Sequence, residues 1–158
     1  MSGFAPRIGR EEFKRLAPGV AAALAALGEA ASQAGLDPAL LELVKLRASQ
    51  INGCAFCIQY HLTAARALRI PREKLDLLAV WQEVGLFSEQ ERAALGWTET
   101  LTEVTLGVTD EDYEEARAHF SAVQLAHLSG AIALINGWNR IAAGFRFAPE
   151  PPGPRAVT

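Results

Sequence analysis

Residues 42–61 read ELVKLRASQINGCAFCIQYH and join two helical patterns across Asn52-Gly53. Residues 39–51 place leucines and a valine at helical spacing, and Asp37-Pro38 ahead of them offers a capping side chain followed by proline at the first helical position. Residues 54–68 are helical again, and Asn-Gly is typical of a helix end or a turn. The segment therefore predicts a helical hairpin.

Both cysteines of the chain lie just after this turn, in the motif Cys54-x-x-Cys57, and His61 follows four residues later. Each residue of an α-helix turns by about 100°, so these three residues are expected within about 60° of one another on one stripe. Cys57 and His61 are i,i+4 neighbours, which places their side chains within reach of each other.

Glu42 can be placed on the same hairpin by counting residues. It precedes the turn by about ten residues and His61 follows it by about eight, so at about 1.5 Å per residue both lie roughly 12–15 Å from the turn. If the two helices are antiparallel and suitably rotated, Glu42 and His61 face each other.

These four residues suit thiol redox chemistry. A thiol attacks a peroxide only as its thiolate, and His61 is placed to accept the proton of Cys57 while Glu42 holds the imidazole. Oxidation of one cysteine gives a sulfenic acid, with which the second thiol condenses to a disulfide. An external dithiol then restores both thiols.

Other interpretations of these residues remain open. The cysteines could be inert buried thiols, or two thiolates, an imidazole and a carboxylate could bind zinc. Structural zinc sites usually draw a second ligand pair from a distant motif, which this sequence lacks. Glu42 could also be a solvated helix carboxylate paired with Lys45 on its own helix.

The rest of the chain also predicts helices and no strand series or glycine-rich phosphate loop. Ser88 with Glu91 has the spacing of a capping box, and Ser121 is expected to cap a long, apolar final helix. The further helices are expected over residues 19–34, 71–81, 88–106, 109–120 and 121–143. The fold class is therefore all-α.

Length and composition indicate one ordinary globular domain. The chain has 158 residues, half of them hydrophobic, and 15 basic against 18 acidic side chains give a net charge of −3. No basic block points to nucleic acid or a membrane surface, and no signal peptide or transmembrane run is evident, so a cytoplasmic location is expected. We expect a domain at 1–145 with its redox core at 37–68, and a loose proline-rich tail at 146–158.

The segment from Glu42 to His61 resembles the core of the alkyl hydroperoxidase D (AhpD)-like group of the carboxymuconolactone decarboxylase superfamily. Its pattern, E-x11-C-x2-C-x3-H, is matched at all four positions. Residues 131–140, AIALINGWNR, are similar to the Asn-x-x-Asn-Arg helix common in these proteins. The resemblance implies that most of residues 20–145 share the family's all-α fold and assemble as homotrimers or homohexamers.

The resemblance also implies an activity and a role for each site residue. It implies a peroxidase in which Cys57 attacks a small hydroperoxide, Cys54 resolves the product, and His61 and Glu42 relay protons. The reductant would be an external dithiol, for example of the lipoyl type, and no cofactor or metal is implied. Many relatives carry histidine or tyrosine where this chain has Phe56, so weaker activity is expected if that polar group orders the relay.

Two rival functions are kept beside the peroxidase. One is a non-redox lyase or ring-opening enzyme on the same fold, although decarboxylase members of the superfamily lack the cysteine pair. The other is a binding or assembly protein whose cysteines only sense oxidants. Asn139 and Arg140 are expected to cap a helix or to form an intersubunit ion pair, and Trp138 is expected in the core or at a subunit interface.

Overall fold

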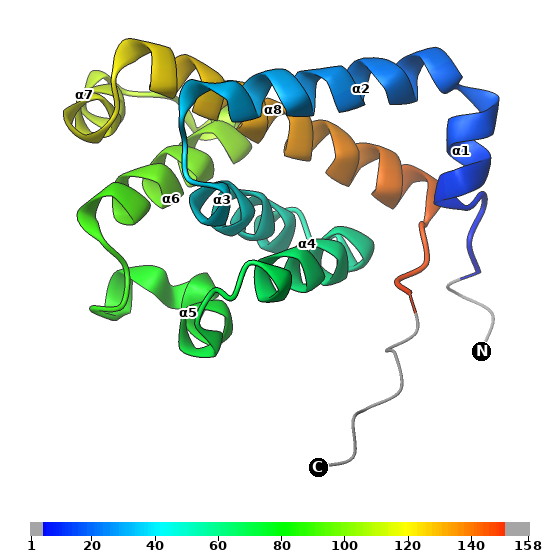
Figure 1. The fold of residues 1–158 in the computed structure, drawn as a ribbon, viewed down its shortest axis with the longest axis horizontal. Helices are drawn as coiled ribbons and strands as arrows, with labels where there is room; N and C mark the ends of the chain where they lie inside the picture. The colour runs from blue at the N-terminus through cyan, green and yellow to red at the C-terminus, as the bar shows by residue number, and fades with distance from the viewer. Residues whose placement is uncertain (1–4, 151–158) are drawn as a thin grey trace.

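A computed structural model describes residues 5–150 as a set of α-helices joined by short loops and 3-10 turns (Figure 1). No strand occurs among these residues, which confirms the predicted all-α class. In chain order the elements are α1 (Arg10–Leu16), α2 (Pro18–Ala31), η1 (Ser32–Ala34), α3 (Pro38–Ile51), α4 (Ala55–Ala67), α5 (Arg72–Leu77), η2 (Leu78–Glu83), α6 (Glu89–Thr102), η3 (Val104–Leu106), α7 (Asp110–His119) and α8 (Ala122–Phe145).

Local capping explains where several helices begin. α6 and α8 start with complete capping boxes, in which Ser88 pairs with Glu91 and Ser121 with Gln124. Each pair satisfies two backbone N–H groups that the first helical turn would otherwise leave without a partner. At α3 the Asp37 carboxylate accepts the N–H of Ala39, as the sequence predicted.

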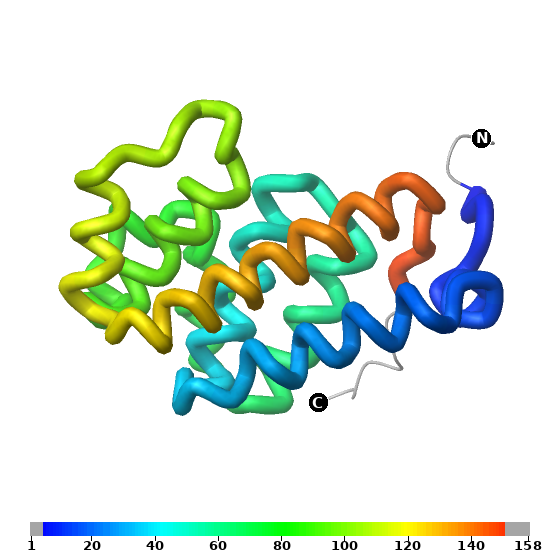
Figure 2. The backbone as a smooth tube through the Cα atoms, turned by 90° about the horizontal axis from the view of Figure 1, so that it is seen from above, coloured from blue at the N-terminus to red at the C-terminus, as the bar shows by residue number. Residues whose placement is uncertain are grey.

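The long helices α2 and α8 lie side by side over the α3–α4 hairpin (Figures 1 and 2). Glycines allow the two to approach closely: a Cβ atom on Gly28 would lie 3.1 Å from Leu134 Cδ2, and one on Gly137 would lie 4.0 Å from Leu24 Cδ2. Close packing is the expected role of a glycine inside a helix, where it otherwise costs about 1 kcal/mol against alanine.

Helix α3 is the central element of the fold. It contacts α4, α6 and α8, and its Val44, Leu46 and Ala48 are completely buried. Because α3 is enclosed on most sides, its polar side chains need hydrogen-bond partners, either on α3 itself or on the helices around it. Glu42, Lys45 and Ser49 of α3 belong to the site described below.

The structure differs from the sequence-based expectation in three places. Helix α1 was not predicted, although Glu11 and Glu12 in its first turn and basic residues in its last turn suit the helix dipole. The predicted helix 71–81 is divided into α5 and η2, with Val80 in a non-helical conformation. The predicted helix 88–106 stops at Thr102 and continues only as the short η3.

The two ends of the described chain meet beside α1 (Figure 1). The N–H of Arg7 donates to the carbonyl of Phe145, and Phe147 is buried against Phe13. Within the predicted loose tail 146–158, Phe147 is therefore packed against the protein. Residues 151–158 of that tail lie outside the residues that the structure describes.

No single helix within residues 5–150 is both long and apolar enough to cross a membrane. Only α7 and α8 taken together, across a bend of 114°, reach that length and composition.

Candidate active site

The cysteine pair lies where the hairpin turns into α4. Asn52 ends α3, and Gly53 has φ +65°, a left-handed conformation that glycine adopts without strain. Cys54 is the N-cap residue of α4, and its sulfur accepts the N–H of Cys57 at 3.3 Å. The prediction that Cys54 lies on the helical stripe of Cys57 and His61 is therefore wrong, because Cys54 precedes the helix.

Cys54 and Cys57 form a disulfide, with Cα atoms 5.3 Å apart. Both residues are buried, with exposed fractions of 4% and 3%. They pack in a cluster with Phe13 from α1, Ala142 from α8 and Phe147 after α8. Elements from both ends of the chain thus enclose the sulfur atoms.

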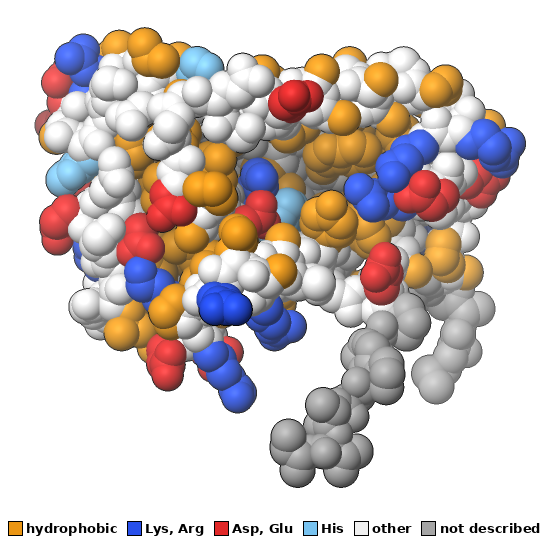
Figure 3. Space-filling view, in the orientation of Figure 1, with side chains coloured by type: hydrophobic (Ala, Val, Ile, Leu, Met, Phe, Trp, Pro, Cys, Tyr) orange, Lys and Arg blue, Asp and Glu red, His pale blue; other side chains and the backbone are white. Residues whose placement is uncertain are grey.

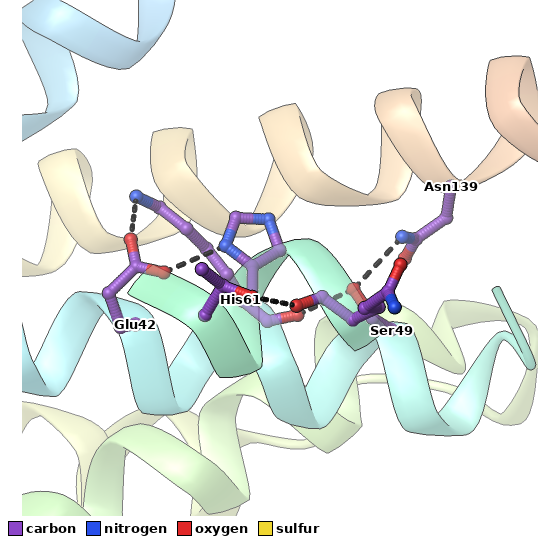
Figure 4. Close-up of polar contacts among 7 residues, drawn as sticks. Glu42, Ser49, His61 and Asn139 are labelled. Atoms are coloured by element: carbon purple, nitrogen blue, oxygen red, sulfur yellow. Dashed lines mark hydrogen bonds and ion pairs between the residues drawn. The ribbon is translucent and has the colours of Figure 1, made fainter. Parts of the chain in front are cut away.

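Glu42 and His61 face each other from α3 and α4, as the residue count predicted (Figure 4). His61 Nδ1 lies 2.8 Å from Glu42 Oε2, and the other carboxylate oxygen accepts a hydrogen bond from Lys45 Nζ, also at 2.8 Å. The two expected partners of Glu42 are therefore both present, each on its own oxygen. All three side chains are largely buried.

This environment keeps Glu42 ionised. Burial alone would raise the pKa of its carboxyl group, but hydrogen bonds and charge from His61 and Lys45 outweigh burial, so the pKa lies below its ordinary value. An ionised carboxylate only accepts hydrogen bonds, so His61 Nδ1 is the donor. A neutral imidazole then has Nε2 as a free base, and no side chain among residues 5–150 bonds to that nitrogen.

A cavity of about 320 Å³ opens beside this cluster, between α2, α4 and α8. Figure 3 shows hydrophobic side chains gathered in a hollow beneath α2, with basic, acidic and histidine side chains beside it. Cys57 and His61 both contribute to its wall, whereas Cys54 does not. Further lining residues come from α1, α2, α3, α4 and α8 and include Arg10, Lys14, Leu24, Lys45, Tyr60, Leu134 and Trp138.

A second polar cluster lies at the opposite end of α3, where Ser49 and Asn139 are buried and Asn52 is exposed (Figure 4). Asn139 Nδ2 donates to Ser49 Oγ at 3.0 Å, and Asn139 Oδ1 accepts from Asn52 Nδ2 at 2.8 Å. The Ser49 hydroxyl donates to the carbonyl of Lys45, and the Ser49 carbonyl accepts the N–H of Cys54. This cluster ties α8 to the turn that precedes the cysteines.

The structure does not show the expected helix-capping role of Asn139 and Arg140, and an intersubunit ion pair of Arg140 stays a prediction. Asn139 is 2% exposed and bridges α8 to α3, so it neither caps a helix nor reaches a surface ion pair. Arg140 is exposed and donates to the carbonyl and side-chain oxygens of Asn136, one turn earlier on α8. Only the packing of α8 against α3 reveals the partners of Asn139, whereas Asn136 is the i−4 neighbour of Arg140 on α8.

Comparison with known proteins assigns the chain to a family, since the carboxymuconolactone decarboxylase family model matches residues 18–100. The chain belongs to the carboxymuconolactone decarboxylase family. It is 38% identical over 110 residues to the uncharacterized protein YdfG of Bacillus subtilis, an alignment that covers 69% of this chain and 75% of YdfG. The expected AhpD-like membership of the superfamily is confirmed.

Solved structures agree with this family assignment. A protein of Agrobacterium tumefaciens, of unknown function and proposed to be an antioxidant defence protein AhpD, superposes with a TM-score of 0.86 at 38% identity. That match covers 93% of this chain and 99% of the other. The debrominase Bmp8, in a cysteine-to-alanine form in complex with 2,3,4-tribromopyrrole, shares the fold at 17% identity, with a TM-score of 0.77 and coverage of 95% and 93%.

Within this carboxymuconolactone decarboxylase fold, residues that the motif did not include also line the pocket. Tyr60 and Trp138 are in its wall, and the Arg10 guanidinium lies 5.0 Å from the centre of the Tyr60 ring. Phe56, the departure from the AhpD-like pattern, packs against Tyr60 and Phe147 with ring centroids 6.2 and 5.4 Å away. The described residues contain no group of three or more histidine, cysteine or acidic side chains arranged to hold a metal ion.

Proposed function

We propose that this protein is a thiol-dependent peroxidase that reduces small hydroperoxides through a Cys54/Cys57 dithiol–disulfide cycle. The observation that supports it best is the shared pocket: Cys57 of the disulfide pair lines the same cavity as His61, whose Nδ1 is held by Glu42 at 2.8 Å. A redox pair, a base and a space for substrate therefore meet in one place.

In the oxidative half of the cycle, the free nitrogen of His61 accepts the proton of Cys57. The resulting thiolate attacks one peroxide oxygen, the O–O bond breaks, and the departing alkoxide is protonated to an alcohol. Cys57 is now a sulfenic acid. Cys54 attacks its sulfur, water leaves, and the disulfide forms; the two electrons taken up by the peroxide come from the cysteine pair.

An external dithiol completes the cycle by returning two electrons and two protons. The mostly apolar pocket suits a dithiol on a flexible chain, such as a dihydrolipoyl group. We also propose a homotrimer or homohexamer, because family resemblance implies one and α2 presents exposed apolar residues such as Val20 and Leu27. Sedimentation as a monomer at micromolar concentration would refute the assembly.

The deciding experiment is peroxide consumption with a panel of dithiols that includes dihydrolipoamide, comparing the wild type with Cys57→Ser. The wild type should consume alkyl hydroperoxide with at least one dithiol, and Cys57→Ser should fall to the uncatalysed rate. Turnover that is indifferent to both cysteines would support the non-redox lyase. A stable disulfide without peroxide turnover would support an oxidant sensor.

A second candidate is thiol-dependent removal of a halogen from an aromatic ring. It is favoured by the apolar wall beside Cys57 and by the shared fold with Bmp8, which was solved with a tribromopyrrole. Such a reaction would exchange bromine for hydrogen while the cysteine pair becomes a disulfide. Adding 2,3,4-tribromopyrrole to the substrate panel, with bromide release as the readout, tests this alternative.

A further inference from the structure

We infer that the reducing dithiol attacks the sulfur of Cys57, the same sulfur that attacks the peroxide, and that Cys54 is the leaving group. This inference rests on the proposed function, because it describes the reductive half of that cycle. Any external thiol must touch one of the two disulfide sulfurs, and the choice determines which residue forms the mixed disulfide. The surroundings of the two cysteines differ enough to decide it.

Access favours Cys57. It belongs to the wall of the cavity of about 320 Å³, beside His61 and Tyr60, whereas Cys54 contributes nothing to that wall. Thiol–disulfide exchange requires direct approach to the attacked sulfur. A thiol that occupies the pocket therefore reaches Cys57 first.

The cover over the pair blocks the alternative approach. Cys54 and Cys57 are similarly buried, with exposed fractions of 4% and 3%, and both pack in an apolar cluster with the buried Phe13 and Phe147. Those two rings come from α1 and from the segment after α8, and their centroids lie 6.1 Å apart. Because only Cys57 also borders the cavity, attack on Cys54 would have to pass through this apolar cluster.

Cys54 is also the better placed leaving group. Its sulfur already accepts the N–H of Cys57 at 3.3 Å, at the N-terminus of the 13-residue helix α4. A thiolate released there is stabilised by that hydrogen bond and by the helix dipole. A better stabilised thiolate leaves faster in exchange reactions.

Two successive exchanges return the cysteines to the reduced state. A thiolate of the dithiol attacks Cys57 sulfur, the Cys54–Cys57 bond breaks, and Cys54 departs with the electron pair. The second thiol of the reductant then attacks the reductant's first sulfur, which is bonded to Cys57 in the mixed disulfide. The reductant closes to a cyclic disulfide, and Cys57 leaves as a thiolate. The two protons of the dithiol end on the two cysteine sulfurs.

Sharing one sulfur and one pocket has a kinetic consequence. Peroxide reacts with the dithiol form of the enzyme, and the reductant reacts with the disulfide form. Each can nevertheless occupy the cavity of the form with which it does not react. Ping-pong kinetics with substrate inhibition by excess dithiol, relieved by raising the peroxide concentration, is therefore expected.

The direct test maps the mixed disulfide formed by a monothiol, which cannot close a ring. Oxidised full-length protein is treated with 2-mercaptoethanol and quenched at short times with acid and N-ethylmaleimide. Chymotrypsin then cleaves after Phe56, between the two cysteines, and the peptides are sequenced by mass spectrometry. The mercaptoethanol adduct should lie on Cys57, with maleimide on Cys54, in at least about tenfold excess over the reverse product. Equal amounts or a Cys54 adduct at the earliest times would overturn the inference.

Two variants separate access from acid–base effects. In His61→Ala the reaction should slow but the adduct should stay on Cys57, because access selects the sulfur. In Phe147→Ala, which opens the cover, the share of Cys54 adduct should rise by at least about threefold. An unchanged product ratio in Phe147→Ala contradicts the proposed role of the cover.

The mapping uses no peroxide, so the two proposals can fail separately. A Cys57 adduct in a protein that consumes no peroxide would refute the peroxidase and support the regiochemistry. Peroxide consumption combined with a Cys54 adduct would support the peroxidase and refute the proposed attack on Cys57.

Discussion

The two clusters of polar side chains at the ends of α3, one around Glu42 and the other around Ser49, differ in their chemical groups. Around Glu42 they are ionisable, pair with His61 and Lys45, and face a pocket. Around Ser49 they are hydroxyls and amides, satisfied by Asn139 and by the turn before the cysteines. Figure 4 shows both groups along one helix.

The difference separates chemistry from positioning. Titratable groups that adjoin a cavity can exchange protons with a bound molecule, whereas neutral, fully bonded groups in a core hold backbone segments in place. Cys54 and Cys57 lie directly after the turn that the neutral cluster holds in place. The ionisable cluster around Glu42 and the neutral cluster around Ser49 therefore both affect the cysteine pair, the first by proton transfer and the second by positioning. Perturbing each cluster should therefore give a different signature.

The largest effect is expected from His61→Ala. Without the base, alkylation of reduced Cys57 and peroxide turnover near pH 7 should fall by about 10²- to 10⁴-fold, the usual contribution of a general base. Raising the pH should recover part of the loss, because hydroxide then forms the thiolate. His127→Ala is the matched control, since within residues 5–150 the side chain of His127 bonds only to the carbonyl of Val123 on its own helix. Unchanged thiol reactivity in His61→Ala would remove histidine from the relay.

Asn139→Ala should affect stability more than chemistry. It removes the hydrogen bond that Ser49 Oγ accepts in the core and one of the two that Asn52 donates, a loss of about 1–3 kcal/mol. Urea unfolding should show this loss, while the alkylation rate of reduced Cys57 should change by less than about threefold. Arg140→Ala, on the exposed side of the same helix, should change stability by less than about 0.5 kcal/mol. A large rate defect in a stable Asn139→Ala would place this cluster in the chemistry.

Glu42→Gln should produce a smaller, pH-dependent effect. Because the pKa of Glu42 is lowered in the fold, its stabilising contribution is present above the unfolded value of about 4.3 and is lost as pH falls through the folded value. The variant should be less stable by about 1.5 kcal/mol at neutral pH, and the gap should close in acid. Denaturation of both proteins across pH 3–8 measures it.

Exposed Glu29 on α2 provides the control, since a surface substitution such as Glu29→Gln should change stability by less than about 0.5 kcal/mol. A gap for Glu42→Gln that is independent of pH would mean that shape, rather than charge, matters at residue 42. Thiol alkylation by Glu42→Gln should also slow, by less than in His61→Ala.

The smallest effect is expected from Lys45→Met. The Lys45 side chain is 24% exposed, against 12% for Glu42, its partner three residues away on the same helix, and such an ion pair is worth about 0.2–1 kcal/mol. The methionine keeps most of the apolar stem in the pocket wall. Thermal unfolding at low and high salt should show a difference from wild type that shrinks with salt. A difference that persists in high salt would indicate packing instead.

Much of the hairpin site was predictable because its determinants are local. The spacing of Cys57 and His61, the capping side chain of Asp37 and the break at Asn52-Gly53 all act within a few residues. Even the meeting of Glu42 with His61 follows from counting along two helices joined by a short turn. Short-range geometry and capping leave few alternatives, so the sequence alone determined these features.

Other features depended on how distant segments pack. The bridge from Asn139 to Ser49 spans 90 residues, and the cover over Cys54 combines Phe13 with Phe147. No periodicity encodes such pairs, because they follow from the crossing of α8 over α3 and the meeting of the two chain ends. The tertiary structure therefore decided which cysteine faces the pocket, since Cys57 borders the cavity between α2, α4 and α8 only when these remote elements assemble.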